Sequence, residues 1–535
     1  MKDGLQLKAA FAIYMGARPF TLLDDRYFRQ YLSSLSGYFN YIPPSHSELA
    51  GGLLQKAYEL VHREVLLMLE NEDYLNIVMD ESGDIADRHI INMCIVTPIG
   101  AFYYETEDSK DESQTAQMLF EWMMKKVQAL VGKGGWWRFN SFITDTCNTM
   151  RAVWSLVQRD PRTKHVFCIP CNSHGLQLLI HDLLDIEPYS TLLEKAQTIA
   201  QFFRRAKLQY AILRKHQHTH FGRSKAFVLA VSTQWGTQAG LIGSVLDNKR
   251  PLISYLNDEN AEPAPDVKSI IRQTPFWACL DDLYTLLGGI SERQKMSEST
   301  HAHIGQVHQC WIEVHEHIRV TTMEVGTFQL KPEATARLLP AFSARHQKQN
   351  VPIHLVAYFL DPSSIQSEQI PTSEQNEVII AFLKRYGSDM ARQQYGQFRS
   401  QQGYFSVTGS VWELAGSARA FWQEVSIFAP ELARLALGIF YTPSNSVSSE
   451  RSFSTRNLIH DKKRNRLDAK RADKLSFVHI NKRILDRQPS DIRGWLDRRL
   501  KDEDLVEYEE DCIVDDACEE EPGWIHDFIA RSSGG

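Results

Sequence analysis

Between residues 74 and 186 the hydrophobic pattern of the chain switches between the period of a strand and the period of a helix. Three short strand-type runs come first, with Pro98 and Gly100 at a turn between the second and the third. Helix-type and strand-type segments then alternate. In chain order the pattern predicts strands at 74–80, 88–98 and 101–107, a helix at 115–132, a strand at 139–145, a helix at 149–158, a strand at 164–170 and a helix at 173–185. This β-β-β-α-β-α-β-α order predicts an α/β fold with a mixed sheet and helices on its faces.

The predicted order is also that of a ribonuclease-H-like fold, in which the first and fourth strands are neighbours. Asp80 is expected to end the first of these strands and Asp145 the fourth. Side chains at adjacent strand ends can approach within metal-bridging distance, and carboxylates suit two hard divalent cations, Mg²⁺ or Mn²⁺. A third acid must come from elsewhere, and Glu450 is the candidate. Taken singly, Asp80 could instead be a turn or helix-cap residue, and Asp145 could be the N-cap of the next helix.

The net charge of −7 is unevenly distributed along the chain. Residues 501–535 carry thirteen acidic residues against Lys501 and Arg531, a net charge of −11, which leaves +4 for residues 1–500. Within that body, 201–225 holds seven Lys or Arg and no acid, and 461–474 holds seven against three Asp. Such basic segments can neutralise the phosphates of DNA, although each could equally be a solvated helix face.

The cysteine pattern and the N-terminus indicate an intracellular protein. The eight cysteines are scattered apart from Cys168 and Cys171, so we expect mostly reduced thiols. The N-terminal residues lack the apolar core and cleavage site of a secretion signal, and no run of 18 uncharged apolar residues predicts a membrane span. Cys168, Cys171 and His174 together could be part of a zinc site, but no second pair follows at finger spacing.

Residues 443–467 read PSNSVSSERSFSTRNLIHDKKRNRL, which places Glu450 at the head of an amphipathic stretch that becomes strongly basic. The serines at 446–449 can cap a helix that starts near Glu450, and the positive end of that helix favours an acid and an approaching phosphate. The segment closely resembles the C-terminal signature of the hAT transposase superfamily, with its Ser-rich lead, Glu-Arg-x-Phe-Ser core and later Arg-Asn-x-Leu. The apolar residues that suit core and dimer contacts here are Phe453, Leu458, Ile459, Leu467, Leu475, Val478 and Ile480.

The resemblance to the hAT superfamily covers most of residues 15–485. Asp80 stands where the family usually has an Asp followed by Gly-Trp-Thr, although the aromatic residue is absent here. The other matching motifs are Thr144-Asp145-Thr146-Cys147-Asn148, the Cys-x-x-His of Cys171 and His174, Ser232-Thr233-Gln234-Trp235 in place of Thr-Arg-Trp, and the Leu-Asp-Pro of residues 360–362. By this resemblance Cys171 and His174 lie beside the catalytic acids and shape the site.

The resemblance also implies a domain organisation, since the family has a large all-α insertion between its second Asp and its Glu. The pattern between 187 and 435 is almost wholly helical, as such an insertion requires. The segments expected are an N-terminal helical segment (1–70), the first part of a ribonuclease-H-like catalytic domain (71–186), the all-α insertion (187–435), the last part of the catalytic domain with the dimerisation region (436–500) and an acidic tail expected to be flexible (501–535). The BED zinc finger that commonly begins these transposases has no matching Cys and His pattern before residue 70.

The family implies a nuclear DNA transposase that cleaves and joins DNA strands as a homodimer or higher homo-oligomer. Asp80, Asp145 and Glu450 would be its catalytic residues and would hold two Mg²⁺ or Mn²⁺ ions. Trp235 would stack on a base rotated out of the duplex. Further DNA-binding residues expected from the basic segments are Arg204, Arg205, Arg214, Lys215, Arg451, Lys462, Lys463, Arg464 and Arg466. The alternatives are a domesticated, catalytically idle derivative that acts as a dimeric nuclear DNA- or protein-binding module, and a nonspecific two-metal nuclease.

Overall fold

The computed structural model describes residues 2–35, 42–83, 89–108, 115–132, 134–230, 236–299, 302–323, 332–406, 410–460 and 467–489. These residues form two compact units. Among the described residues, the first unit takes in those up to Cys171 and those from Leu355 onward, and the second takes in Asn172–His354. The expected acidic tail lies outside the described residues.

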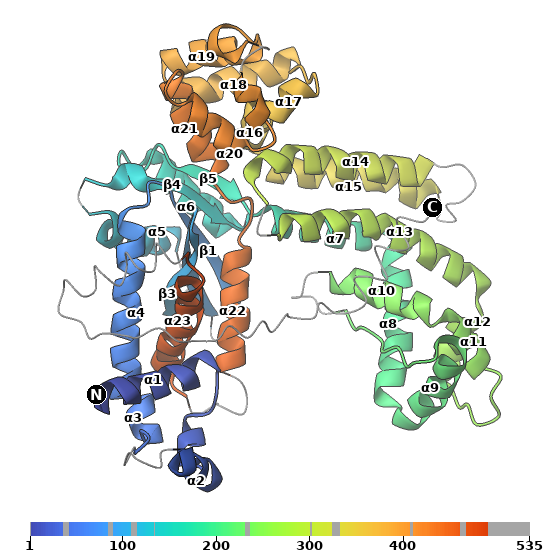
Figure 1. Ribbon diagram of the computed structural model, residues 1–535. Helices are drawn as coiled ribbons and strands as arrows, with labels where there is room; N and C mark the ends of the chain where they lie inside the picture. The colour runs from blue at the N-terminus through green and yellow to red at the C-terminus, as the bar shows by residue number, and fades with distance from the viewer. Residues whose placement is uncertain are drawn as a thin grey trace. The chain divides into compact units, whose positions relative to one another are not determined.

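The first unit is an α/β structure, and most of its helices and strands are labelled in Figure 1. Its strands are β1 (Leu75–Gly83), β2 (His89–Thr97), β3 (Gly100–Asp108), β4 (Phe139–Thr144) and β5 (Phe167–Pro170). Its helices before the second unit are α1 (Lys2–Met15), α2 (Arg26–Leu35), α3 (His46–Ala50), α4 (Gly52–Glu70), α5 (Ala116–Val131) and α6 (Asn148–Arg159). Its later helices are α16 (Pro352–Leu360), which crosses the unit boundary, α17 (Pro362–Gln366), α18 (Ser373–Tyr386), α19 (Asp389–Arg399), α20 (Ala418–Val425), α21 (Pro430–Phe440), α22 (Val447–Ile459) and α23 (Ala469–Asp486). Short 3-10 turns lie at η1 (Phe20–Asp24), η2 (Trp136–Arg138), η4 (Gly403–Phe405) and η5 (Ser410–Leu414).

The five strands form one mixed sheet in the order β3-β2-β1-β4-β5. The first three strands pair antiparallel, and β1, β4 and β5 run parallel. Their Val, Ile and Phe side chains suit a pleated surface, and every residue of β4 is buried, as expected of a strand covered on both faces. The predicted order of strands and helices is therefore confirmed, as is the expected pairing of the first strand with the fourth.

The chain that returns after α21 is fixed to the sheet by buried polar side chains. The Asn140 amide donates to the carbonyl of Gly438 at 2.9 Å, to the Thr442 hydroxyl at 2.9 Å and to Asn76 Oδ1 at 2.8 Å. Asn76 in turn donates to the Tyr441 carbonyl at 3.0 Å. Because a buried amide left without partners is costly, these bonds specify where the returning chain crosses the sheet. From there α22 packs against β1, β2 and β3, and α23 packs against β3 and α4.

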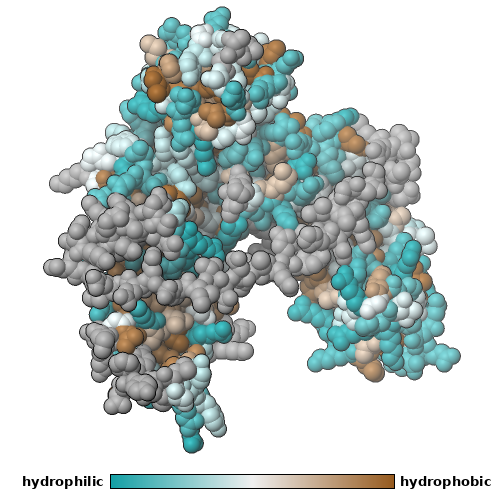
Figure 2. All heavy atoms as spheres, viewed as in Figure 1, coloured by the Kyte–Doolittle hydropathy of each residue, from teal (hydrophilic) through white to brown (hydrophobic). Residues whose placement is uncertain are grey.

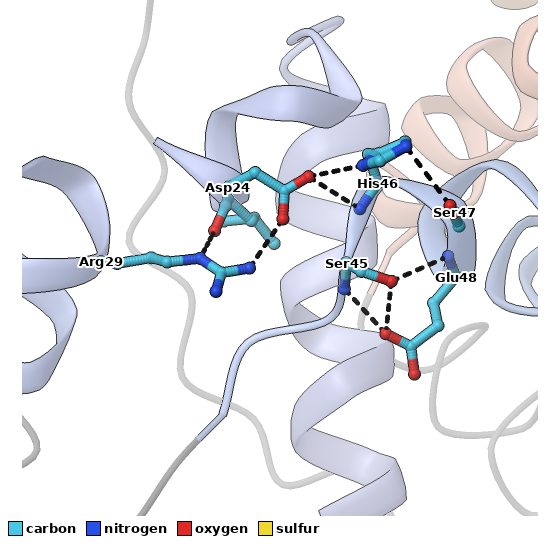
Figure 3. Close-up of polar contacts among 7 residues, drawn as sticks. Asp24, Arg29, Ser45, His46, Ser47 and Glu48 are labelled. Atoms are coloured by element: carbon cyan, nitrogen blue, oxygen red, sulfur yellow. Dashed lines mark hydrogen bonds and ion pairs between the residues drawn. The ribbon is translucent and has the colours of Figure 1, made fainter. Parts of the chain in front are cut away.

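A polar network ties the N-terminal helices of the first unit together (Figure 3). The Asp24 carboxylate accepts hydrogen bonds from Arg29 at 2.6 Å and from Nδ1 of His46 at 2.7 Å. Burial raises the pKa of Asp24, but the hydrogen bonds from His46 and the charge of Arg29 outweigh burial and lower it overall. Ser45 and Glu48 form a reciprocal capping box at the start of α3. The network thus joins η1, α2 and α3.

The second unit contains only helices among its described residues. They are α7 (Asn172–Leu184), α8 (Tyr189–Arg205), α9 (Lys207–Phe221), α10 (Thr237–Asp247), α11 (Lys249–Tyr255), α12 (Pro265–Arg272), α13 (Thr274–Ser297), α14 (Val307–Met323) and α15 (Pro332–Gln349), with a 3-10 turn η3 (Ile304–Gln306). The long helix α13 packs against α7, α8, α10, α12 and α14 around one hydrophobic core. The Arg345 guanidinium holds Asp182 of α7 through two hydrogen bonds of 2.6 and 2.8 Å.

The helical character predicted for 187–435 is confirmed for the described residues, since every element from Tyr189 to Phe440 is a helix or a 3-10 turn. The helices of this stretch belong to two units, because those from Leu355 onward pack with the sheet-containing unit. No helix in the described part of the chain is long and apolar enough to cross a membrane.

Candidate active site

Asp80 and Asp145 lie at matching positions on two neighbouring parallel strands. The last paired residues of β1 and β4 are Val78 and Ile143, and each aspartate follows two residues later, Asp80 within β1 and Asp145 directly after the end of β4. The carboxyl ends of parallel strands meet at one edge of a sheet, which is where both aspartates lie. The charge of Asp145 is also one cause of the raised pKa of Asp80.

The expectation that Asp80 ends its strand is wrong by three residues. β1 continues to Gly83, because Glu81, Ser82 and Gly83 pair with β2 after β4 has stopped at Thr144. Asp80 therefore lies where β1 loses its parallel neighbour. Since it is inside a strand, it is neither a helix cap nor a turn residue.

The electrostatics of this edge favour protonated acids. Burial, followed by the charge of Asp145, raises the pKa of Asp80 to about 7, although a 3.0 Å hydrogen bond from the backbone N–H of Glu81 opposes the shift. Burial and Asp145 also raise the pKa of Glu81. The charge of Asp145 therefore disfavours the ionised forms of Asp80 and Glu81, and a bound cation would offset that effect.

Asp145 does not cap the helix that follows it. The N-cap of α6 is Cys147, whose Sγ accepts the backbone N–H of Met150 at 3.4 Å. One Asp145 oxygen accepts the N–H of Cys147 at 3.2 Å, which closes the turn between β4 and α6. Asp145 therefore stabilises the turn before α6, and it is not the N-cap of that helix.

Glu450 lies in the first turn of α22. This helix begins at Val447, three residues earlier than the predicted start near Glu450. Ser446 is its N-cap but makes no side-chain capping hydrogen bond. Two serines of the hAT-like segment, Ser449 and Ser452, instead form hydrogen bonds with Asn92 of β2.

Asn92 connects this first turn to the strand that carries Asp80. In the antiparallel pairing of β1 and β2, Asn92 is directly opposite Asp80, so both side chains lie on the same face of the sheet. The Asn92 amide donates to the Ser449 carbonyl at 3.1 Å and to the Ser452 hydroxyl at 2.5 Å, and its oxygen accepts the Ser449 hydroxyl. Because Ser449 and Ser452 flank Glu450 on α22, the cross-strand partner of one acid fixes the helical turn that carries the other.

Cys171 makes a second connection to α22. Its backbone N–H donates to the carbonyl of Thr144, the residue before Asp145, at 2.8 Å. Its Sγ accepts the backbone N–H of Ser446 at 3.2 Å. Cys171 therefore joins the end of β4 to the start of α22. His174 lies in the first turn of α7, in the second unit.

Among the described residues, no three His, Cys, Asp or Glu side chains are grouped so that they could hold a metal ion. This applies to Asp80, Asp145 and Glu450 as a set, and also to Cys168, Cys171 and His174. The residues that do fit a divalent cation are the aspartate pair, whose oxygens are hard ligands and whose mutual repulsion a cation would cancel.

Two family models match this chain, and together they cover both parts of the candidate site. A domain of unknown function (DUF659) matches residues 44–199, which include Asp80, Asp145 and Cys171. The hAT family C-terminal dimerisation region matches residues 416–481, which include Glu450. This is an hAT family transposase-like protein. The predicted resemblance is confirmed, and no curated protein matches the chain.

The basic residues expected to bind DNA in this transposase-like protein are partly described. Arg204 and Arg205 end α8, while Arg214 and Lys215 lie on α9, and all four are exposed. The guanidinium of Arg214 lies over the ring of Tyr210, 4.4 Å from its centroid. Figure 2 shows mainly hydrophilic side chains where α9 and α11 lie.

Of the remaining residues expected to bind DNA, the structure describes Arg451 alone. Arg451, next to Glu450 on α22, is exposed. Trp235, Lys462, Lys463, Arg464 and Arg466 lie outside the described residues.

Two residues of the site were not predicted from the sequence, Asn92 and Glu81. The sequence feature that could have identified Asn92 is its polar amide in the middle of an apolar strand. Asn92 lies on the same face of the sheet as Cys94. Such a residue needs a buried partner, but the sequence does not indicate that the partner lies more than 350 positions away. Glu81 could be recognised only once its proximity to Asp145 was known.

Proposed function

We propose that this hAT transposase-like protein catalyses metal-dependent DNA strand cleavage and strand transfer in the nucleus, with Asp80, Asp145 and Glu450 as the catalytic residues. The sheet order and the parallel β1–β4 pair are those expected of a ribonuclease-H-like catalytic domain, which supports this assignment. The observation that carries the proposal is the Asn92 connection, which ties the turn carrying Glu450 to the strand carrying Asp80.

The proposed cofactor is a pair of Mg²⁺ or Mn²⁺ ions. Asp80, Asp145 and Glu450 would hold them, and the raised pKa of Asp80 supports a site in which a bound cation favours the ionised form of that carboxyl group. When bound, such ions activate the attacking oxygen and stabilise the leaving oxygen of an in-line phosphoryl displacement.

The residues of the chain would position the DNA around these acids. The exposed Arg451 follows Glu450 at the N-terminal end of α22, where a cation and the helix dipole both favour a phosphate. The exposed basic residues of α8 and α9 would bind the phosphate backbone of the DNA without reading its sequence.

The direct test is strand cleavage or transfer on DNA that carries the inverted repeats flanking the encoding locus, with Mg²⁺ or Mn²⁺. We expect Asp145→Asn to lower the rate at least about a hundredfold, because one ligand of the metal pair is removed. Glu121→Gln, which neutralises an exposed acid of α5, is the matched control and should keep wild-type activity. Undiminished activity of Asp145→Asn would refute the assignment.

Metal binding can be measured without catalysis. Mg²⁺ should raise the unfolding temperature of the wild-type protein and of Glu121→Gln, since a ligand that binds only the folded state stabilises it. Asp80→Asn and Asp145→Asn should show little response. An equal response in all four proteins would exclude the aspartates as ligands.

The second candidate function is a catalytically idle, dimeric nuclear DNA- or protein-binding module. The observation in its favour is that the three acids do not form a compact metal-binding group among the described residues. This alternative predicts DNA affinity that falls with salt, with no metal-dependent cleavage of any DNA.

A further inference from the structure

The matched dimerisation region, 416–481, contains many apolar residues, but most are unavailable to a second protein chain. Phe453, Ile459, Leu475 and Val478 are buried inside the first unit, between the sheet and its neighbouring helices. Of the apolar set expected from the sequence to supply core and dimer contacts, these four residues therefore belong to the core. Of that set, Leu458 is a large side chain that remains exposed, with 63% of its surface accessible.

A different pair of residues is exposed within the same region. Ile427 and Phe428 lie between α20 and α21, with 80% and 54% of their surfaces exposed. The ring of Phe428 stacks on Tyr404, with centroids 3.7 Å apart and ring planes at 15°. In Figure 2, hydrophobic side chains are visible on the part of the first unit formed by α16–α21.

The turn that presents this pair is rigid. The backbone N–H groups of Phe428 and Ala429 both donate to the carbonyl of Val425 at 2.9 Å, and Pro430 starts α21 immediately afterwards. Ala429 is buried beneath the turn. Because these hydrogen bonds and the stack on Tyr404 already restrain the turn, binding through it would cost less conformational entropy than binding through an unrestrained loop.

We propose that the α20–α21 turn, through Ile427 and the Tyr404–Phe428 stack, is the contact surface for a second copy of this chain. The proposal rests on the match to the dimerisation region, which supplies the partner, and not on strand cleavage. Exposed aromatic and aliphatic side chains that are held in place are the usual centre of a protein interface, whereas a single exposed residue such as Leu458 is common on any surface. Because the partner is identical, the two turns would meet about a twofold axis.

The test is the oligomeric state of the full chain, measured by sedimentation velocity over a range of concentrations without DNA or metal. We expect a dimer for the wild type and an at least tenfold larger dissociation constant for Ile427→Asp, the rough effect of removing one central contact. Leu458→Asp, in the same matched region, and Ile370→Asp, at an exposed site outside it, are the matched controls and should remain dimers. All three substituted positions are exposed, and the unfolding temperature of each variant checks that it folds.

Each other outcome has a defined meaning. A monomeric wild type, or an Ile427→Asp dimer as tight as the wild type, overturns the proposal. Dissociation by Leu458→Asp alone would move the interface to α22 and also overturn it. Because the measurement needs neither metal nor DNA, a failure of the proposed cleavage activity leaves its result unaffected.

Discussion

Burial and the charge of Asp145 raise the pKa of Asp80 to about 7, from an ordinary value of 3.8 for the same group in the unfolded chain. Between these two values the folded protein keeps a proton that the unfolded chain has lost. The free energy of unfolding therefore falls as the pH rises from about 4 to 7, and the penalty is fully present above pH 7. Asp80 therefore lowers the stability of the metal-free protein at neutral pH, as expected of an acid with the proposed role in binding a cation.

Asp80→Asn should consequently stabilise the metal-free protein at pH 8, by about 2 kcal/mol, and have little effect near pH 4. Urea unfolding at pH 4, 6 and 8 measures this difference. Glu121→Gln, on the exposed face of α5, should show no comparable pH-dependent gain. A stability difference that is the same at all three pH values would contradict the electrostatic explanation.

At the scale of elements, the attachment of α22 to the sheet depends on one side chain. Asn92 uses both its amide nitrogen and its oxygen on Ser449 and Ser452, and it is completely buried. Asn92→Ala removes these bonds and leaves buried polar groups of α22 without partners, which should cost about 2 to 4 kcal/mol. Hydrogen exchange should accelerate first in the N-terminal turns of α22. Asn457→Ala, at an exposed position of the same helix, is the control and should leave that exchange unchanged.

The elements themselves were largely predictable, whereas the contacts between distant ones were not. Strands such as β1 and β4 carry strong local signals, namely β-branched and aromatic residues in short runs, so their positions followed from the sequence. The end of β1 did not, because Glu81 and Ser82 look like loop residues until their pairing with β2 is known. The start of α22 was also misplaced, since serine predicts a cap, and here the serines bind Asn92 instead.

For the whole molecule, the division into units follows long-range packing that no local pattern reveals. The helices after Leu355 have the same periodicity as those before it, yet they join the unit that contains the sheet. Similarly, the aspartates could be predicted as neighbours from strand order alone. Their relation to Glu450 depends on buried amides at Asn76, Asn92 and Asn140, whose partners lie about 300 to 365 residues away.

The charge distribution of the whole molecule leads to a test of DNA binding. Replacing Arg204, Arg205, Arg214 and Lys215 by Gln should weaken duplex DNA binding and reduce the slope of log affinity against log salt by about 3 to 4, because each phosphate contact contributes roughly 0.9. The matched control replaces four exposed basic residues of the first unit and makes the same change in net charge: Arg63, Lys125, Arg159 and Lys164. The control should change the slope by less than about 1. Equal losses in the two variants would mean that net charge, and not the surface of α8 and α9, determines the affinity for DNA.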